Sequence, residues 1–209
     1  MHQLQFDDKK TFDDWGLYLT SFNLTDPEPK TYYVDIPYSD GSLDLTEAVT
    51  GNITYRMREL TAVFTLPHHK FDALLPEIRG YLHGKIKKIY FLNDDNYYLS
   101  GRCKTSFQSD GFIGRITISA ICKPYRLKTD ETILEVSVDG TQEVLIENEQ
   151  MTTVPKFTTD ASVQIVHGAN TYSINAGTHT LPIVLEQGDT AIQINGTANV
   201  TIAYQEGIL

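Results

Sequence analysis

The stretch Tyr97–Lys123, YYLSGRCKTSFQSDGFIGRITISAICK, decides the fold of the first part of the chain. Its halves, Tyr97–Phe107 and Phe112–Lys123, are rich in β-branched and aromatic residues, which favour strands. Between them Ser109-Asp110-Gly111 is a turn signal, so the stretch predicts an antiparallel hairpin. Upstream runs of the same kind predict four more strands: Leu17–Leu24, Tyr32–Ile36, Arg58–Leu66 and Ile86–Leu92.

One upstream segment, Lys70–Leu82, breaks this pattern. Its apolar residues follow i, i+3, i+4, i+7, i+11 spacing, which places them on one helical face: Phe71, Leu74, Leu75, Ile78 and Leu82. Pro76 is expected to kink or restart this helix, and His83-Gly84 to end it with a left-handed glycine. Such a helix would cover one face of the sheet.

After Pro124 the pattern changes to short alternating strands about ten residues apart. Asp139-Gly140 and Asn195-Gly196 suit two-residue hairpin turns, because both central positions of such turns need positive φ. This pattern is typical of a β-sandwich. The sequence therefore predicts a mainly β (α+β) protein of two domains, residues 1–127 and 128–209, the first sandwich-like or barrel-like with one kinked helix.

The two cysteines, Cys103 and Cys122, lie on opposite sides of the predicted hairpin turn. Facing partners across that turn should have residue numbers that sum to about 220, whereas these two sum to 225. They are predicted not to face each other, and two buried thiols are favoured over a disulfide. Two cysteines alone cannot form a structural zinc site.

The net charge of −10 argues against a protein that grips nucleic-acid phosphates. Residues 131–209 hold one base, Lys156, and ten acids, a net of −9, which leaves −1 for residues 1–130. This asymmetry favours two units with different surroundings. No apolar run approaches the roughly 18 residues that span a membrane, and the start lacks the form of a signal peptide, so we expect a cytoplasmic protein.

Residues that could carry catalysis have simpler interpretations. The acid pairs Asp7-Asp8, Asp13-Asp14 and Asp94-Asp95 could serve a hydrolase, but adjacent strand residues point to opposite faces. Asn93-Asp94-Asp95-Asn96 is favoured as a turn over a calcium site, and His68-His69 lacks the i, i+4 spacing of helical metal ligands. No nucleophile elbow, phosphate loop or dinucleotide fingerprint occurs. We expect no enzyme activity, no cofactor and no metal.

A sugar-binding module is a stronger rival, since jelly-roll sandwiches often carry lectin sites built on exposed aromatic rings. The predicted sandwich has Phe157, Tyr172 and Tyr204. The two tyrosines are in phase with apolar strand positions, so core packing is favoured over a sugar platform. For Trp15, core anchoring is slightly preferred to an interface contact.

The segment Pro37–Gly51 is longer than a typical hairpin loop and has Ser39, Asp40, Gly41 and Ser42 at its centre. Long loops inside compact domains are usually functional or ordered by a partner.

Several motifs, in order along the chain, resemble those of siphophage distal tail proteins. Phe6-Asp7-Asp8-Lys9-Lys10 followed by Phe12-Asp13-Asp14-Trp15-Gly16-Leu17 is similar to that family's start, which has Phe, a polar turn, an aspartate and Gly-Leu. Further similar motifs follow: Gly41-Ser42-Leu43-Asp44-Leu45-Thr46, Tyr55-Arg56, Leu82-His83-Gly84-Lys85 and the hairpin from Asn96 to Arg102. Segments near the end resemble the closing strands of the family's galectin-like second domain: Ser173-Ile174-Asn175-Ala176-Gly177, Glu186-Gln187-Gly188-Asp189 and Val200–Gly207.

The resemblance implies a structural protein that forms a hexameric ring at the distal end of a phage tail tube. Residues 1–127 would be the ring-forming, tail-tube-like domain, and residues 128–209 a galectin-like jelly-roll β-sandwich outside it. The implied partners are further copies of itself, the tail tube, the tape measure and the tail-associated baseplate proteins. DNA would pass through the bore without specific binding, assembly would occur in the bacterial host cytoplasm, and the ring would sit at the virion tail tip.

On this resemblance the loop Pro37–Gly51 would reach a neighbouring subunit, with an ordinary mobile loop as the open alternative. The candidate interface residues are Asp40, Gly41, Leu43, Leu45 and Thr46. A cyclic ring needs a head-to-tail interface, so each subunit must offer two different surfaces. Two rival functions stay open: a carbohydrate-binding accessory protein that uses the C-terminal sandwich, and a hydrolase that uses acids not yet placed.

Overall fold

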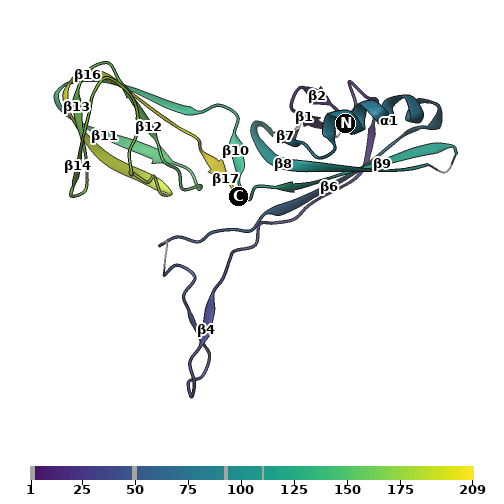
Figure 1. Ribbon diagram of the computed structural model, residues 1–209, viewed down its shortest axis with the longest axis horizontal. Helices are drawn as coiled ribbons and strands as arrows, with labels where there is room; N and C mark the ends of the chain where they lie inside the picture. Colours follow the sequence, from purple (N-terminus) through teal and green to yellow (C-terminus); the bar gives the residue numbers. More distant parts are fainter. Residues whose placement is uncertain (1–2, 49–50, 92–93, 110) are drawn as a thin grey trace. The chain divides into compact units, whose positions relative to one another are not determined.

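The computed structural model describes residues 3–48, 51–91, 94–109 and 111–209, with the side chains of 68–71 and 95 left out. The chain divides into two compact units, Met1–Pro124 and Tyr125–Leu209. Strands dominate both units, and Figure 1 shows one helix, α1, in the first. The predicted mainly β fold class is confirmed.

The first unit is built on one antiparallel sheet with the strand order β2-β1-β7-β8-β9-β6-β3. Its strands are β1 (Leu4–Phe6), β2 (Lys9–Lys10), β3 (Tyr18–Leu24), β6 (Arg58–Pro67), β7 (Ile86–Phe91), β8 (Asp94–Ser109) and β9 (Ile113–Cys122). The predicted β8–β9 hairpin is present, with Ser109 opposite Gly114 at its end. Asp110 of the first predicted turn and Asn93 of the predicted Asn93–Asn96 turn lie outside the described residues. Contrary to the prediction, Asp94 does not lie in a turn but begins β8 opposite Phe91.

This sheet curls strongly. Phe22 on β3 and Phe91 on β7 stack edge to face with ring centroids 5.5 Å apart. Three strands separate β3 from β7 in the sheet order, so a flat sheet would hold them about 19 Å apart at about 4.8 Å per strand. The curl supports the barrel-like form predicted for this domain.

The inner face of the curled sheet encloses a single core. On β6 and β9 every second side chain is buried, as strand alternation requires. The buried residues include Leu60, Ala62, Phe64, Leu66, Ile116, Ile118 and Ala120. Leu4, Phe6, Trp15 and Leu17 join the same cluster from the start of the chain.

Helix α1 (His68–Leu82) supplies the rest of this core. Ile78 and Leu82 are fully buried and Leu74 and Leu75 pack on the cluster, so the predicted apolar face is confirmed at these four positions. The side chain of Phe71, the fifth predicted residue, lies outside the described residues. The helix runs through Pro76 as one element, so it does not restart there, and the kink at Pro76 stays a prediction. Proline removes one helical hydrogen bond, and we attribute the helix's continuity to burial of that face, which offsets this loss.

The helix ends as predicted. The His83 amide bonds the Arg79 carbonyl at 2.9 Å, and Gly84 has φ of 76°. Glycine adopts this left-handed conformation without the strain that other residues suffer. The side chains of His68 and His69 lie outside the described residues.

Cys103 and Cys122 are two free, buried thiols, as predicted. Cys103 lies opposite Ala120 and Cys122 opposite Gly101, so facing partners have numbers that sum to 223 and the cysteines are diagonal neighbours. Burial and the nearby Cys122 thiol raise the pKa of Cys103 from 9.0 to about 12. Burial raises the pKa of Cys122 to about 11.

These shifts predict inert thiols in the folded protein. Because only the thiolate reacts, a disulfide reagent at pH 8 will label neither cysteine until denaturant unfolds the chain, and then both. Because folding raises the pKa of both thiols, their protonated state contributes to the free energy of unfolding. This contribution is fully present below about pH 9, the pKa of an exposed thiol, and is lost as the pH rises through the folded values of about 11 and 12. Rapid labelling of the native protein would contradict the burial.

The second unit is held together by two strands of 17 residues each, β11 (Thr132–Asn148) and β16 (Gly188–Tyr204), which pair along their whole length. The other strands are β10 (Arg126–Lys128), β12 (Lys156–Thr159), β13 (Val163–His167), β14 (Asn170–Ile174), β15 (Gly177–Thr180) and β17 (Gly207–Ile208). The order β14-β13-β16-β12-β15 places β16 at the centre, and β10 pairs with β17. That this unit is galectin-like stays a prediction.

The prediction of hairpin turns at Asp139-Gly140 and Asn195-Gly196 was wrong. Both dipeptides lie inside the long strands, where Gly140 pairs directly with Gly196 at φ of 92° and 144°. Glycine inside a strand marks a bend or a close backbone approach. β16 pairs with β13 up to Gly196 and with β12 from Val200 onward, so the paired glycines stand where the partner strand changes.

Gly196→Ala will therefore destabilise the second unit. A Cβ there would lie 3.0 Å from Val163 Cγ1 and 3.2 Å from the Ser162 carbonyl oxygen, at a φ that disfavours side chains. We expect a loss of about 2–4 kcal/mol of unfolding free energy in urea. Gly140→Ala is the matched control, because its Cβ would meet nothing within 4 Å. Gly140→Ala should cost about 1–2 kcal/mol from backbone strain alone. If both variants lost the same unfolding free energy, the predicted clash of a Cβ at position 196 would be wrong.

Candidate functional site

The segment between β3 and β6 departs most from the prediction. The sequence predicts a loop over Pro37–Gly51, whereas the structure forms a hairpin from β4 (Tyr33–Asp35) and β5 (Ser42–Asp44), of which only the first strand was expected. The two strands make a two-stranded sheet of their own. We call residues 28–48 and 51–56 the arm.

Backbone pairing closes the base of the arm. Pro29 and Tyr55 form a bridge, the Lys30 amide bonds the Thr54 carbonyl at 2.8 Å, and the Arg56 amide bonds the Glu28 carbonyl at 2.7 Å. Figure 1 draws the β4 hairpin standing clear of the sheet of its own unit. The arm is thus a paired structural element and not an irregular loop.

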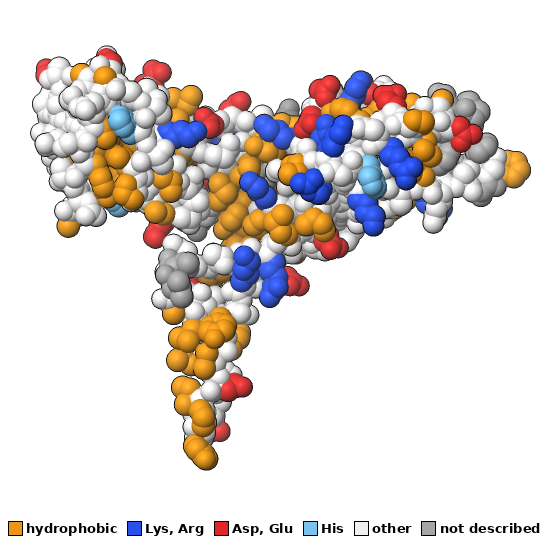
Figure 2. Space-filling view, viewed as in Figure 1, with side chains coloured by type: hydrophobic (Ala, Val, Ile, Leu, Met, Phe, Trp, Pro, Cys, Tyr) orange, Lys and Arg blue, Asp and Glu red, His pale blue; other side chains and the backbone are white. Residues whose placement is uncertain are grey.

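One face of the hairpin is apolar and exposed. Because strand side chains alternate, Val34 and Leu43, which are paired across β4 and β5, point to the same face. Tyr32, Ile36 and Leu45 continue this face by the same alternation. Tyr32 is 63% exposed, Leu43 49% and Ile36 47%, and Figure 2 shows hydrophobic side chains covering the arm.

The opposite face carries Asp35, Ser42 and Asp44 beside the exposed ring of Tyr33, and its polar side chains fix the register. The Ser42 hydroxyl donates to Asp35 at 2.6 Å, and the Thr46 amide donates to Asp44 at 2.9 Å. Hydrogen bonds from Thr46 hold the pKa of Asp44 below its usual value. Thr46 Oγ1 also accepts the Tyr32 amide at 3.0 Å, so its side chain ties the two strands together.

The five predicted interface residues therefore play different parts. Leu43 and Leu45 belong to the apolar face, and Thr46 secures the register. Asp40 and Gly41 lie in the exposed turn, where Gly41 has φ of 75°. Sequence reasoning missed Tyr32, Val34 and Ile36, whose signal was the alternation of Tyr32–Ile36 opposite Ser42–Leu45.

An isolated two-stranded hairpin is only marginally stable in water. Exposed apolar patches on a soluble protein mark surfaces that bind a partner. The arm joins both features, so its geometry suits docking into another protein surface.

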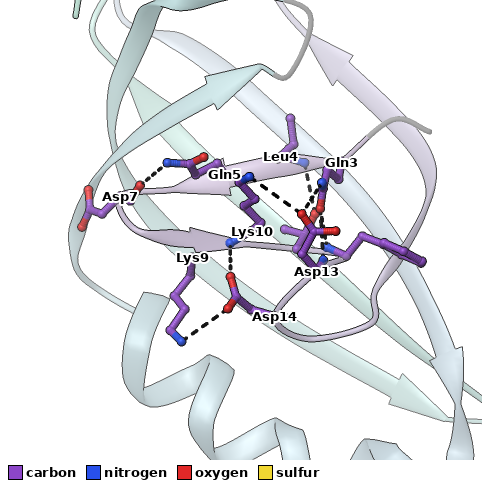
Figure 3. Close-up of polar contacts among 10 residues, drawn as sticks. Gln3, Leu4, Gln5, Asp7, Lys9, Lys10, Asp13 and Asp14 are labelled. Atoms are coloured by element: carbon purple, nitrogen blue, oxygen red, sulfur yellow. Dashed lines mark hydrogen bonds and ion pairs between the residues drawn. The ribbon is translucent and has the colours of Figure 1, made fainter.

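The N-terminal motifs build a compact hairpin corner instead of a reactive site (Figure 3). Asp13 accepts the Gln3 amide group at 3.0 Å, and Asp14 accepts the Lys10 backbone amide at 2.7 Å. Asp7, with φ of 51°, accepts the Lys88 amide at 2.8 Å and pairs with Lys87 at 2.9 Å.

Asp8 bonds the Tyr81 hydroxyl, which keeps the pKa of that carboxyl below its usual value. Each acid therefore has its own structural partner, and neither Asp7-Asp8 nor Asp13-Asp14 supports a hydrolase.

Trp15 is a core anchor, as preferred from the sequence. It is 3% exposed, its indole Nε1 donates to Glu77 of α1 at 3.0 Å, and its ring meets Tyr81 edge to face at 5.7 Å. The residue ties the N-terminal corner to the helix.

The three aromatic residues of the predicted sandwich form no exposed platform for sugar. Phe157 and Tyr204 are buried, and Tyr172 packs half-buried against the same core. The Tyr204 hydroxyl donates to the Glu147 carbonyl. The predicted core packing of these tyrosines is confirmed, and the carbohydrate-binding alternative loses its aromatic residues.

The described residues contain neither a metal-ligand cluster nor a membrane-spanning helix. Within residues 3–48, 51–91, 94–109 and 111–209, no group of three His, Cys, Asp or Glu side chains is placed to hold a metal ion. In the same part of the chain, no helix is both long enough and apolar enough to cross a membrane.

Comparison with known proteins gives a match at the level of structure. No protein-family model and no curated protein sequence matches this chain. The crystal structure of the SPP1 Dit protein, described as a paradigm of the hub adsorption apparatus in phages that infect Gram-positive bacteria, matches with a TM-score of 0.71 and 15% identity. The match covers 100% of both chains.

A de novo designed double-stranded β-helix matches 37% of this chain at a TM-score of 0.27 and 16% identity, which is too low to support an argument. The resemblance to distal tail proteins is thus confirmed as a likeness of fold. The chain has, over its whole length, the mainly β fold of a phage adsorption hub protein.

Proposed function

We propose that this protein is a structural component of a siphophage tail, a hub that assembles as a hexameric ring at the distal end of the tail tube. Its work is assembly and not catalysis. The ring would connect the tail tube and tape measure to the baseplate or tail-tip proteins. It would form in the host cytoplasm and remain at the virion tail tip.

The observation that carries this proposal is the full-length likeness to a hub protein at a TM-score of 0.71. The arm supports it independently, because a folded chain that exposes an amphipathic hairpin needs a partner surface to bury it. The net charge of −1 over residues 1–130, which include the proposed ring domain, is compatible with passage of DNA through a bore, since a surface with few excess cations releases few counterions on contact with phosphates.

Light scattering of the purified protein, with negative-stain images of the same peak, tests the proposal. Six copies of a 23.6 kDa chain should weigh about 140 kDa and appear as a ring with a central hole. The assembled peak should persist at moderate salt, because the arm face is apolar. A protein that stays monomeric at high concentration, also with a tail-tube protein added, would overturn the ring.

A further inference from the structure

A groove on the outer face of the first unit's sheet has the chemistry to receive the arm. Its apolar lining includes Met57, Ile86 and Ile121, which are 55%, 59% and 47% exposed. Arg102 on β8 pairs with Ile86 on one side and Ile121 on the other, so the three form one row across β7, β8 and β9. This exposed row lies outside the core cluster.

Cations lie within this row and beside it. Arg102, Lys104 and Lys123 line the groove, and no acidic residue lines it in the part of the chain that the structure describes. Glu59 stands beyond Ile121 at the end of the row. In Figure 2, Lys and Arg side chains are interspersed with hydrophobic ones on the first unit. The groove therefore favours a ligand that carries both apolar and acidic side chains.

The arm has that composition. Beyond its base, residues 31–48 contain Asp35, Asp40, Asp44 and Glu47 and no Lys or Arg. Its apolar face, Tyr32, Val34, Ile36, Leu43 and Leu45, has no core of its own to pack on. A basic apolar groove and an acidic apolar ribbon are complementary in both hydrophobicity and charge.

We propose that the arm of one copy docks in the Met57/Ile86/Ile121 groove of the next copy. Met57 follows directly after the arm's own base, so a chain's own arm would have to reverse at its root to reach its own groove. Groove and arm are different surfaces of one chain, which is what a head-to-tail cyclic interface requires. The inference rests on the proposed ring and names the surface that receives the arm.

Cross-linking between two singly substituted proteins tests this contact. Leu43→Cys and Ile86→Cys proteins are mixed, allowed to exchange and treated with a short bismaleimide. The native thiols are buried and should stay silent, and the unsubstituted protein measures any background. Only an intermolecular contact can join the two variants, and we expect at least tenfold more cross-linked dimer than with either variant alone.

Two further mixtures give the comparison. Ser42→Cys, on the polar face of the arm, should cross-link to Ile86→Cys several-fold less than Leu43→Cys does. The acidic second unit is the alternative occupant of the groove. Leu145→Cys tests it, because Leu145 is 60% exposed and lies between Glu143 and Glu147. Preferred cross-linking of Ile86→Cys to Leu145→Cys would overturn the arm as occupant.

Charge exchange provides a second readout. Lys104→Glu with Lys123→Glu should weaken assembly at least tenfold, and Asp40→Lys with Glu47→Lys in the same chain should restore most of it. If rings formed but showed neither the Leu43–Ile86 cross-link nor this rescue, docking of the arm in the groove would be refuted and the proposed hub would stand. Absence of any ring would refute the hub itself.

Discussion

Val34→Lys combined with Leu43→Glu will leave the protein folded and abolish its association. The two side chains are paired across β4 and β5 in the middle of the apolar face. Opposite charges at facing positions keep a hairpin paired, so the arm should retain its register. Docking would now bury two charged groups, at a cost of several kcal/mol, and each 1.4 kcal/mol weakens association tenfold.

We therefore expect at least a hundredfold weaker assembly, seen by light scattering as a shift from ring to monomer. Unfolding free energy should change by less than about 0.5 kcal/mol, because Leu43 is half exposed and the arm adds nothing to either core. Ser42→Lys is the control, since it places one charge on the polar face opposite Asp35. It should still form rings, and intact rings in the double variant would show that the apolar face is not used.

Long, regular patterns were predicted well because local and tertiary preferences agree in them. β6, β8, β9 and α1 each bury one face against the same core, so the alternation or the helical spacing is visible in the sequence. The buried thiols followed from the same hairpin, although its register differed by three from the predicted sum. Register depends on which residues close the turn, and composition does not determine that.

Asp139-Gly140 and Asn195-Gly196 show where local signals fail. Both dipeptides accept positive φ, which a tight turn and a bend in a long strand require alike. The choice between turn and bend was made by pairing between residues 56 positions apart, Gly140 and Gly196. No local window of sequence contains that information.

The arm was missed for a related reason. β5 has only three residues, two of them polar, and the turn before it carries Ser, Asp and Gly, so the composition is that of a loop. A strand that belongs to a core can be recognised in the sequence by its alternating apolar residues. The arm's apolar face has no core partner in its own chain, so its alternation was too short to be distinguished from a loop.

Trp15→Ala will remove about 3–5 kcal/mol of unfolding free energy from the first unit, the usual cost of deleting a large buried aromatic side chain. The variant leaves a cavity between the N-terminal corner and α1, and it loses the bond from the indole to Glu77 and the edge contact with Tyr81. Trp15→Phe separates these effects, since it keeps most of the packing and should cost about 1–2 kcal/mol.

The unfolding should be followed by circular dichroism in urea. Trp15 is the chain's single tryptophan, so its replacement removes the tryptophan fluorescence signal. Tyr38→Ala removes a fully exposed aromatic ring and should change the unfolding free energy by less than about 0.5 kcal/mol. If Trp15 were an interface residue, its removal would weaken assembly and leave the unfolding of the monomer within about 1 kcal/mol of the parent. The hydrogen bond to α1 and the 3% exposure favour the core role, so we expect the loss to appear in the monomer itself.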